Sequence, residues 1–274
     1  LLRHLIFGLE RLELMEINNN SNSVLITGGT QGLGFEIARN LIKNGCKELV
    51  IAGRDHKKAN NARDELNKPG VNVKYIQANL ANLSDCKQLI SESINLFPQL
   101  DSLVNSAAIT TRGSIEDTSV ALWEEHMNTN LRAPFLLMQG LVSKLKLEKR
   151  AGSIVNIAST SSYVGQSFLT AYSTSKGGLL TLSKNTAHAL RHHKIRVNVV
   201  APGWMNTPGE AEIQRQFHGA GDDWVEKAES SLPMGELVDP KKVAPLVAYL
   251  LSASSGVITG SVINYDQQII GAVP

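Results

Sequence analysis

The chain has 274 residues, a formal net charge of +2 at pH 7 and 42% hydrophobic residues, a length that suits one large α/β domain or two small ones. The charge pattern has neither the basic surface of a nucleic-acid-binding protein nor an acidic tail, so we expect no nucleic-acid partner. No apolar run is long enough to span a bilayer, so we expect no membrane partner. Cys46 and Cys86 form neither a CxxC pair nor a disulfide framework, which predicts reduced thiols in a cytoplasmic protein.

The first residues differ from the rest of the chain. Residues 1–16 carry apolar side chains at helical spacing, but this run is too short and too charged for a signal peptide. The polar stretch 17–23 that follows is typical of a linker. Residues 1–16 are either an upstream extension, with the domain starting near Met15, or an amphipathic helix that docks on the domain or on a partner subunit. We predict an extension and linker over residues 1–22 and a single domain over 23–274.

Buried strand patterns alternate with helical patterns along this domain. The predicted strands are 24–27, 48–52, 71–76, 102–105, 152–158, 195–200 and 261–265, and helices are predicted to start after each of the first six. This alternation implies a parallel sheet with helices on both faces, and ligands then bind at the carboxyl ends of the strands. Gly28, Gly53, Asn79 and Asn105 all fall at those ends.

A glycine-rich turn, Gly28 to Gly34, joins the first strand to the first helix with the spacing GxxxGxG. Backbone N–H groups and the helix dipole at such a junction attract a phosphate, and glycines allow it to come close. A glycine-rich turn alone carries little weight, but its place between a strand and a helix strengthens the prediction.

Two later stretches carry further expectations. We predict one helix over residues 120–146, with Asn130 in its middle and a kink at Pro134. Residues 204–232 are predicted to be irregular, because they mix aromatic and acidic side chains. A loop of this length in a compact domain is usually functional, often as a lid.

Tyr172 and Lys176 lie four residues apart on a predicted long helix, and therefore on one face of it. A free phenol has a pKa near 10, and a nearby ammonium favours the phenolate. Lowering that pKa to about 7 requires roughly 4 kcal/mol, which one close cation and a second positive charge would supply. Tyr172 is thus a candidate general acid/base, although a YxxxK pair alone equally describes two ordinary surface residues.

From Ser23 to Asp266 the sequence resembles the short, single-domain branch of the short-chain dehydrogenase/reductase family. The motifs that carry the resemblance are Thr27–Gly34, Asn105–Ala108, Asn130, Ser159, Tyr172, Lys176, and Pro202–Gly203 with Thr207. Ser159 precedes Tyr172 by thirteen residues, as in the family. The resemblance implies a doubly wound α/β Rossmann fold whose seven strands lie in the order 3-2-1-4-5-6-7.

The resemblance also implies an NAD(P)-dependent oxidoreductase that interconverts a secondary alcohol and a ketone. Tyr172 would exchange the proton, Lys176 would hold the nicotinamide ribose, Ser159 would hydrogen-bond the reacting oxygen, and Asn130 would hold a water that links Lys176 to solvent. The implied cofactor-binding residues are Thr27, Gly28, Thr30, Gln31, Gly32, Leu33, Gly34, Gly53, Arg54, Asn79, Leu80, Asn105, Ala107, Tyr172, Lys176, Pro202, Gly203 and Thr207.

The sequence departs from the family pattern at three positions. Asn105–Ala108 reads Asn-Ser-Ala-Ala where the family has Asn-Asn-Ala-Gly, which puts the packing around the adenine ribose in doubt. Asn79 stands where an Asp usually meets the adenine, and its amide can still form a hydrogen bond. Asp266 is followed by two glutamines instead of two glycines, which puts the tail and its subunit contacts in doubt.

Two other functions remain as alternatives. A non-catalytic dinucleotide sensor or scaffold would usually lack Tyr172 or Lys176, and both are present. A sugar-nucleotide epimerase or dehydratase also uses YxxxK, but it would carry a GxxGxxG turn and a larger C-terminal region. The histidines show no spacing with other donors that suits a metal, so we expect none.

The predicted pocket favours a small polyhydroxylated or keto substrate such as a sugar, polyol or hydroxy acid. Its expected polar neighbours are Ser159, Ser161, Ser162, Gln166, Thr110 and Thr111, with Trp204 and Met205 as an apolar wall. Arg112 is positioned to meet one acid. The alternative is a hydrophobic ketone, such as a 3-oxoacyl or steroid-like compound.

The second strand predicts the choice of cofactor. An acidic residue at its end would repel a 2′-phosphate, but Gly53 stands there and Arg54 follows. Thr30 adds a hydroxyl, whereas Gln31 occupies a place where a second base often stands in NADP-dependent relatives. We therefore expect NADP in preference to NAD. By the same resemblance we expect a homo-oligomer, a tetramer or a dimer, that pairs through the helices over 120–146 and 170–192 and through the last strand.

Overall fold

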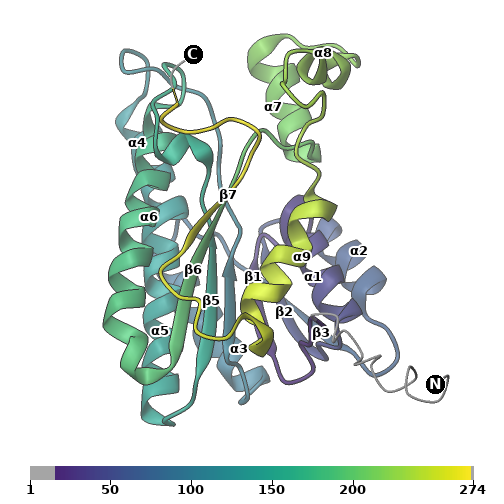
Figure 1. Ribbon diagram of the computed structural model, residues 1–274, viewed down its shortest axis with the longest axis vertical. Helices are drawn as coiled ribbons and strands as arrows, with labels where there is room; N and C mark the ends of the chain where they lie inside the picture. The colour runs from purple at the N-terminus through teal and green to yellow at the C-terminus, as the bar shows by residue number, and fades with distance from the viewer. Residues whose placement is uncertain (1–15, 273–274) are drawn as a thin grey trace, which may run out of the picture.

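Seven parallel strands form one sheet in the computed structural model of the protein, which describes residues 16–272 (Figure 1). The strands are β1 (Ser23–Thr27), β2 (Glu48–Gly53), β3 (Asn72–Gln77), β4 (Ser102–Asn105), β5 (Gly152–Ile157), β6 (Ile195–Pro202) and β7 (Val262–Tyr265). Their order is β3-β2-β1-β4-β5-β6-β7, and every neighbouring pair is parallel. The predicted fold class and strand order are therefore confirmed.

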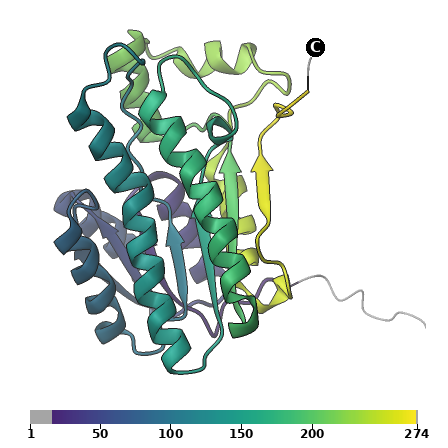
Figure 2. The same ribbon diagram turned by 90° about the vertical axis from the view of Figure 1, so that its left-hand side faces the viewer.

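Helices cover both faces of the sheet (Figures 1 and 2). One face is covered by α1 (Gly32–Lys43), α2 (His56–Leu66) and α9 (Pro240–Leu251), and the other by α3 (Leu83–Leu96), α5 (Ala133–Leu147) and α6 (Thr170–Leu190). The helix α4 (Val120–Met127) precedes α5, while α7 (Pro208–His218) and α8 (Trp224–Ser230) lie beyond the carboxyl ends of the strands. No helix within residues 16–272 has the length and apolar character needed to cross a membrane.

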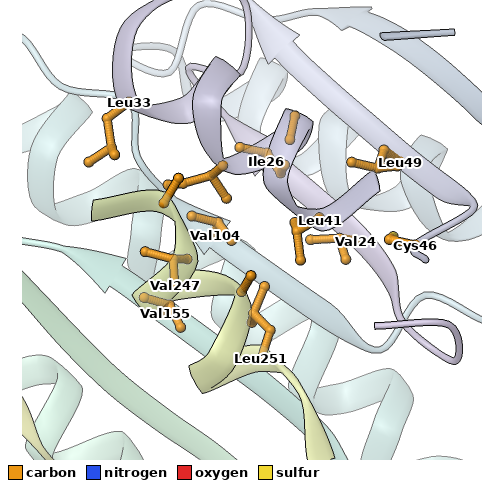
Figure 3. Packing of buried hydrophobic residues seen from close by; sticks show 14 of the residues in the cluster. Val24, Ile26, Leu33, Leu41, Cys46, Leu49, Val104, Val155, Val247 and Leu251 are labelled. Atoms are coloured by element: carbon orange, nitrogen blue, oxygen red, sulfur yellow. The ribbon is translucent and has the colours of Figure 1, made fainter. Parts of the chain in front are cut away.

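The strand sequences explain why both faces are covered. Successive side chains of a strand point to opposite faces, and in β1 every one of them is buried. Val24 and Ile26 pack against α1 and α9, as Figure 3 shows, whereas Leu25 packs into the core on the α3 and α5 side. A strand that is apolar on both faces requires a helical layer on each side.

The prediction of one kinked helix over residues 120–146 is wrong in its detail. A π-helical turn, Asn128–Arg132, joins α4 to α5, and within it the N–H of Ala133 donates to the carbonyl of Asn128. An unbroken α-helix would need the N–H of residue 134 at the carbonyl of Asn130, but Pro134 has none. The shift in register accommodates Pro134 in the first turn of α5, so a π bulge interrupts the helix where the kink was expected.

Residues 204–232 are not irregular as predicted, because they contain α7 and α8. Thr207 caps α7 by accepting a hydrogen bond from the N–H of Glu210, and Gly219 ends it in a left-handed conformation (φ 59°). Both helices share a small apolar cluster around Trp224 and Leu237. This segment, which we call the α7–α8 segment, therefore has a core of its own.

The polar stretch before β1 packs against the domain rather than standing apart from it. Asn19 is fully buried, and its N–H donates to the carbonyl of Asn44 at 2.8 Å. Its side chain donates to the carbonyl of Ala248 in α9 at 3.1 Å. The amphipathic helix considered for residues 1–16 falls, except for Glu16, outside the described residues, and the domain boundary at residue 22 stays a prediction.

Candidate active site

A cavity of about 650 Å³ lies at the carboxyl ends of the strands, lined by segments that follow β1 to β6 and by the α7–α8 segment. Most of the predicted site residues line it: Gly28, Thr30, Gln31, Gly32, Leu33, Gly34, Gly53, Arg54, Asn79, Leu80, Ala107, Ser159, Tyr172, Lys176, Gly203 and Thr207. Four others, Thr27, Asn105, Asn130 and Pro202, do not line it. Sixteen of the twenty predicted site residues therefore lie around one cavity, although they come from distant parts of the sequence.

The glycine turn forms one wall of this cavity. Gly28 and Gly32 adopt positive φ angles of 67° and 55°, and a Cβ on Gly34 would lie 2.3 Å from the carbonyl oxygen of Gly28. These positions therefore require glycine. The cap residue of α1, Gln31, makes no side-chain hydrogen bond to the helix, so the first N–H groups of α1 face the cavity unoccupied by a cap. This bare helix N-terminus fits the pyrophosphate of a dinucleotide.

Thr27 and Asn105 act behind the wall rather than in it. The Thr27 hydroxyl accepts hydrogen bonds from the N–H groups of Ser106 and Ala107 at 3.1 and 3.2 Å, which fixes the turn after β4. The Asn105 amide donates to Asn156 at 2.8 Å inside the sheet. Neither residue lines the cavity, and their role in cofactor binding stays a prediction.

The cavity end beside β2 carries two cations, one of which the sequence analysis missed. Arg54 is largely exposed and lies 3.9 Å from Glu125. Lys58, in the first turn of α2, lines the same cavity as Arg54 and Thr30. Asp55 was the signal that would have found it. This residue caps α2 and so places Lys58 in the first turn of the helix, close behind the end of β2.

Ser159, Tyr172 and Lys176 meet at the centre of the cavity. Lys176 is 2% exposed, and its ammonium donates to the carbonyl of Ile157 at 2.7 Å and lies 5.9 Å from the centre of the Tyr172 ring. Ser159 follows β5, and its hydroxyl lies 2.9 Å from that of Ser161. With one acceptor, two of the three ammonium donors of Lys176 remain for a ligand.

The expected lowering of the Tyr172 pKa is not present in the protein alone. Burial raises the pKa of the Tyr172 phenol, and the neighbouring Ser159 hydroxyl opposes this rise. Burial also lowers the pKa of Lys176 from 10.5 to about 8. Burial is the largest cause of both shifts. The Lys176 ammonium donates to Ile157 and lies 5.9 Å from the centre of the phenol ring.

Asn130 sits in the π-helical turn and is fully buried. Its side-chain oxygen accepts from the N–H of Ile109 at 2.9 Å, and its amide donates to the carbonyl of Ile109 at 3.0 Å and to Ser175 at 3.1 Å. Both amide hydrogens are therefore used. Asn130 ties the chain after β4 to α6, and Pro134 cannot supply the N–H that an unbroken α-helix would place at the main-chain carbonyl of Asn130.

The residues that line the cavity on the side of the α7–α8 segment and the tail were only partly predicted. Arg112, Glu210, Gln214 and His218 line it, as do Trp204 and Met205. Of the polar neighbours expected from the sequence, Thr110, Ser159, Ser161 and Gln166 line the cavity and Thr111 and Ser162 do not. Asp266, Gln267 and Gln268 of the tail also line it. A Cβ on Gly203 would lie 2.2 Å from the Asp266 carboxylate, so this tail presses against the end of β6.

The chain is similar to known proteins over most of its length. Residues 22–217 match the sequence profile of the short chain dehydrogenase family. A 3-oxoacyl-[acyl-carrier-protein] reductase, FabG, of Aquifex aeolicus is 33% identical over 92% of this chain and 98% of the relative.

Solved structures show the same fold. An actinorhodin polyketide ketoreductase with NADPH matches with a TM-score of 0.83 at 28% identity, over 90% of this chain and 96% of that one. A protein of Beutenbergia cavernae, provisionally assigned as an NAD(P)-dependent gluconate 5-dehydrogenase with bound NADP, matches with a TM-score of 0.82 at 25% identity, over 92% and 97%. The chain belongs to the short-chain dehydrogenase family, as an NAD(P)-dependent oxidoreductase that interconverts an alcohol and a ketone.

Proposed function

We propose that the protein is a single-domain NADP-dependent reductase or dehydrogenase in which Tyr172 carries the proton. The observation that supports this most directly is the convergence of Ser159, Tyr172 and Lys176 in a cavity that ends at the bare N-terminus of α1. The cofactor, when bound, supplies the hydride. The protein residues bind the cofactor, orient the substrate and transfer the proton.

Each residue has one role in this proposal. The Ser159 hydroxyl donates to the reacting oxygen and orients it, and the Tyr172 hydroxyl transfers a proton to that oxygen in the direction of ketone reduction. The free donors of Lys176 bind the ribose hydroxyls. Hydrogen bonds to these hydroxyls would replace lost solvation at Lys176, which favours the charged ammonium, and the ammonium in turn favours the phenolate that forms at Tyr172.

The resupply of the proton involves Asn130. We propose that its main-chain carbonyl binds the water that links Lys176 to solvent, since the side-chain amide is occupied by Ile109 and Ser175. Thr27 and Asn130 are positioning residues in this account, because they fix the turn that forms the cavity wall.

NADP is the proposed cofactor because two cations flank the end of β2. Arg54 and Lys58 both line the cavity beside Gly53, which itself carries no carboxylate at the end of β2 that would repel a 2′-phosphate. Arg54 is held only by an exposed pair with Glu125, which contributes little and yields readily to a phosphate. Asp55 is adjacent, but its carboxylate caps α2 by accepting from the N–H of Lys58.

The substrate that the cavity favours is small and polar, such as a ketose, polyol or hydroxy acid. Gln166, Gln267 and Ser161 offer hydrogen bonds around the reacting centre, while Trp204 and Met205 form one apolar wall. A second candidate, reduction of a 3-oxoacyl thioester, is favoured by the activity named for the Aquifex relative.

A panel of polyols, ketoses and 3-oxoacyl esters, followed at the nicotinamide absorbance with NADP(H), tests the proposal. We expect turnover on polyhydroxylated compounds. Turnover confined to the oxoacyl esters would favour the second candidate, and an absence of turnover on every class would contradict the oxidoreductase assignment of this site.

We also propose that the protein forms a homo-oligomer. The edge strand β7 is only partly covered, and Val120, Trp123 and Phe135 expose apolar surface on α4 and α5. These are elements through which the sequence analysis expects pairing.

A further inference from the structure

We propose that Arg112 is an anion subsite that binds a carboxylate of the substrate, and that Glu210 is its counter-ion in the absence of substrate. This inference rests on the proposed function, because it places the carboxylate while Ser159 and Tyr172 hold the reacting oxygen. It narrows the substrate to hydroxy or keto acids.

The backbone around Arg112 is fixed beside the catalytic helix. The N–H of Gly113 donates to the carbonyl of Phe168 at 2.9 Å, and the N–H of Thr170 donates to the carbonyl of Gly113 at 3.0 Å. These bonds join the loop after β4 to Phe168, just before α6, and to Thr170, the first residue of α6 and two positions from Tyr172. Arg112 and Tyr172 therefore line the same part of the cavity.

The Arg112 side chain is nearly buried yet only partly bonded. Its side chain is 13% exposed, and its guanidinium stacks over the Phe168 ring at 5.5 Å. It donates to the carbonyl of Thr110 at 3.1 Å, to His218 at 3.3 Å and to Glu210 at 3.3 Å. Within residues 16–272, three of its five N–H donors are thus used, which leaves one on each terminal nitrogen. A desolvated guanidinium with two free donors is suited to a planar anion.

Glu210 is a loose partner for this cation. One of its oxygens, Oε1, accepts from Arg112, from the Trp204 indole at 2.9 Å and from Gln214 at 2.8 Å. The contact with Arg112 is the longest of the three and is made by a single nitrogen. The paired, two-nitrogen contact that guanidinium groups make with carboxylates is not formed here, so it remains for an incoming carboxylate. Trp204 and Gln214 still hold Glu210 when Arg112 turns to substrate.

The surrounding charges favour a carboxylate over a phosphate. The charged and titratable side chains around Arg112 are Glu210 and His218 from α7 and Tyr172 from α6. A site with one cation and one carboxylate tolerates a ligand with a single negative charge better than a ligand with two negative charges. Glu210 lies close enough to repel a dianion, whereas a substrate carboxylate forms the paired contact.

An equilibrium measurement tests this subsite. The probes are gluconate and gluconamide, which share one skeleton and differ in charge, titrated calorimetrically into the NADP-loaded Tyr172→Phe protein, where proton transfer is removed. We expect gluconate to bind about ten- to a hundredfold more tightly, as for a charge-assisted contact. Arg112→Met should reduce this ratio to below about twofold, while Arg215→Met, an exposed arginine of α7, should leave it unchanged.

Glu210→Gln separates a subsite from a purely structural ion pair. As a counter-ion, Glu210 competes for Arg112, so its neutralisation should strengthen gluconate binding about threefold or more and leave gluconamide binding unchanged. If the ion pair were purely structural, Arg112→Met and Glu210→Gln would each weaken the binding of gluconate and of gluconamide to the same extent.

Several results would overturn the inference. Equal binding of gluconate and gluconamide, binding of neither, or an unchanged ratio in Arg112→Met would each contradict the subsite. Glucose 6-phosphate, which has no carboxylate, would contradict the assignment to a carboxylate if it bound more tightly than gluconate and lost this advantage in Arg112→Met. Because binding is measured without turnover, these outcomes are distinct from failure of the proposed function, which is read from the activity panel.

Discussion

At the scale of single residues, Lys176 is the group whose charge the fold disfavours most clearly. Burial lowers its pKa from 10.5 to about 8. Below pH 8 the ammonium is charged and attracts the cofactor; above pH 8 it loses its proton. We expect NADP affinity measured by calorimetry to fall by up to about tenfold per pH unit above 8. Lys176→Met should bind weakly with no such slope, and a flat wild-type profile from pH 7 to 9.5 would contradict this.

The cofactor preference depends on Arg54 and Lys58. Each charge-assisted contact with the 2′-phosphate contributes roughly 1.5–3 kcal/mol, so Arg54→Ala and Lys58→Ala should each lower the NADP-over-NAD ratio of kcat/KM about tenfold or more. Lys57→Ala is the control, since Lys57 does not line the cavity. A wild type that prefers NAD, or a ratio unchanged in both variants, would refute the assignment.

The catalytic residues were predicted because short-range spacing fixes them, whereas Lys58 was missed although its cap signal, Asp55, is also local. Tyr172 and Lys176 are one helical turn apart, so their proximity follows from the helix alone. The place of Lys58 depends on where α2 starts relative to β2, which only the Asp55 cap sets. Arg112 and Glu210 are 98 residues apart in the chain, and no local pattern predicts their contact.

At the scale of elements, the junction of β1 and α1 leaves no room for a side chain. A Cβ on Gly34 would lie 2.3 Å from the carbonyl oxygen of Gly28, whereas one on Gly165 would meet nothing within 4 Å. Gly34→Ala should therefore displace the turn, weaken NADP binding at least tenfold and lower thermal stability. Gly165→Ala should change neither in calorimetry and thermal melts. Normal NADP binding by Gly34→Ala would show that this turn does not hold the phosphates.

Two elements differ from their predictions for local reasons. Pro134 predicted a kink in one continuous helix, and a π bulge, which accommodates the missing N–H, interrupts the helix there. In α7 the cap signals were present, since Thr207 and Glu210 have the spacing of a capping box and Gly219 ends the helix. The prediction of irregular structure rested instead on the mixture of aromatic and acidic side chains in residues 204–232.

At the scale of the whole molecule, the seven-strand order follows from alternating patterns and the family resemblance, but assembly does not. We expect a homo-oligomer in multi-angle light scattering, and we expect Phe135→Glu to shift it to smaller species. Phe135 on α5 is 43% exposed, and Leu83 on α3, 46% exposed, provides the matched control Leu83→Glu. A wild-type monomer at micromolar concentration would contradict the proposed assembly.

The most direct test of the account is the effect of Tyr172→Phe on turnover and on NADPH affinity, measured on the best substrate from the panel. Removal of the acid/base should lower kcat by about 10²–10⁴-fold and leave the NADPH Kd within about threefold. Tyr163→Phe is the control, because Tyr163 donates to Asn264 at 3.0 Å and does not line the cavity. Near-normal turnover by Tyr172→Phe would contradict the central claim that Tyr172 carries the proton.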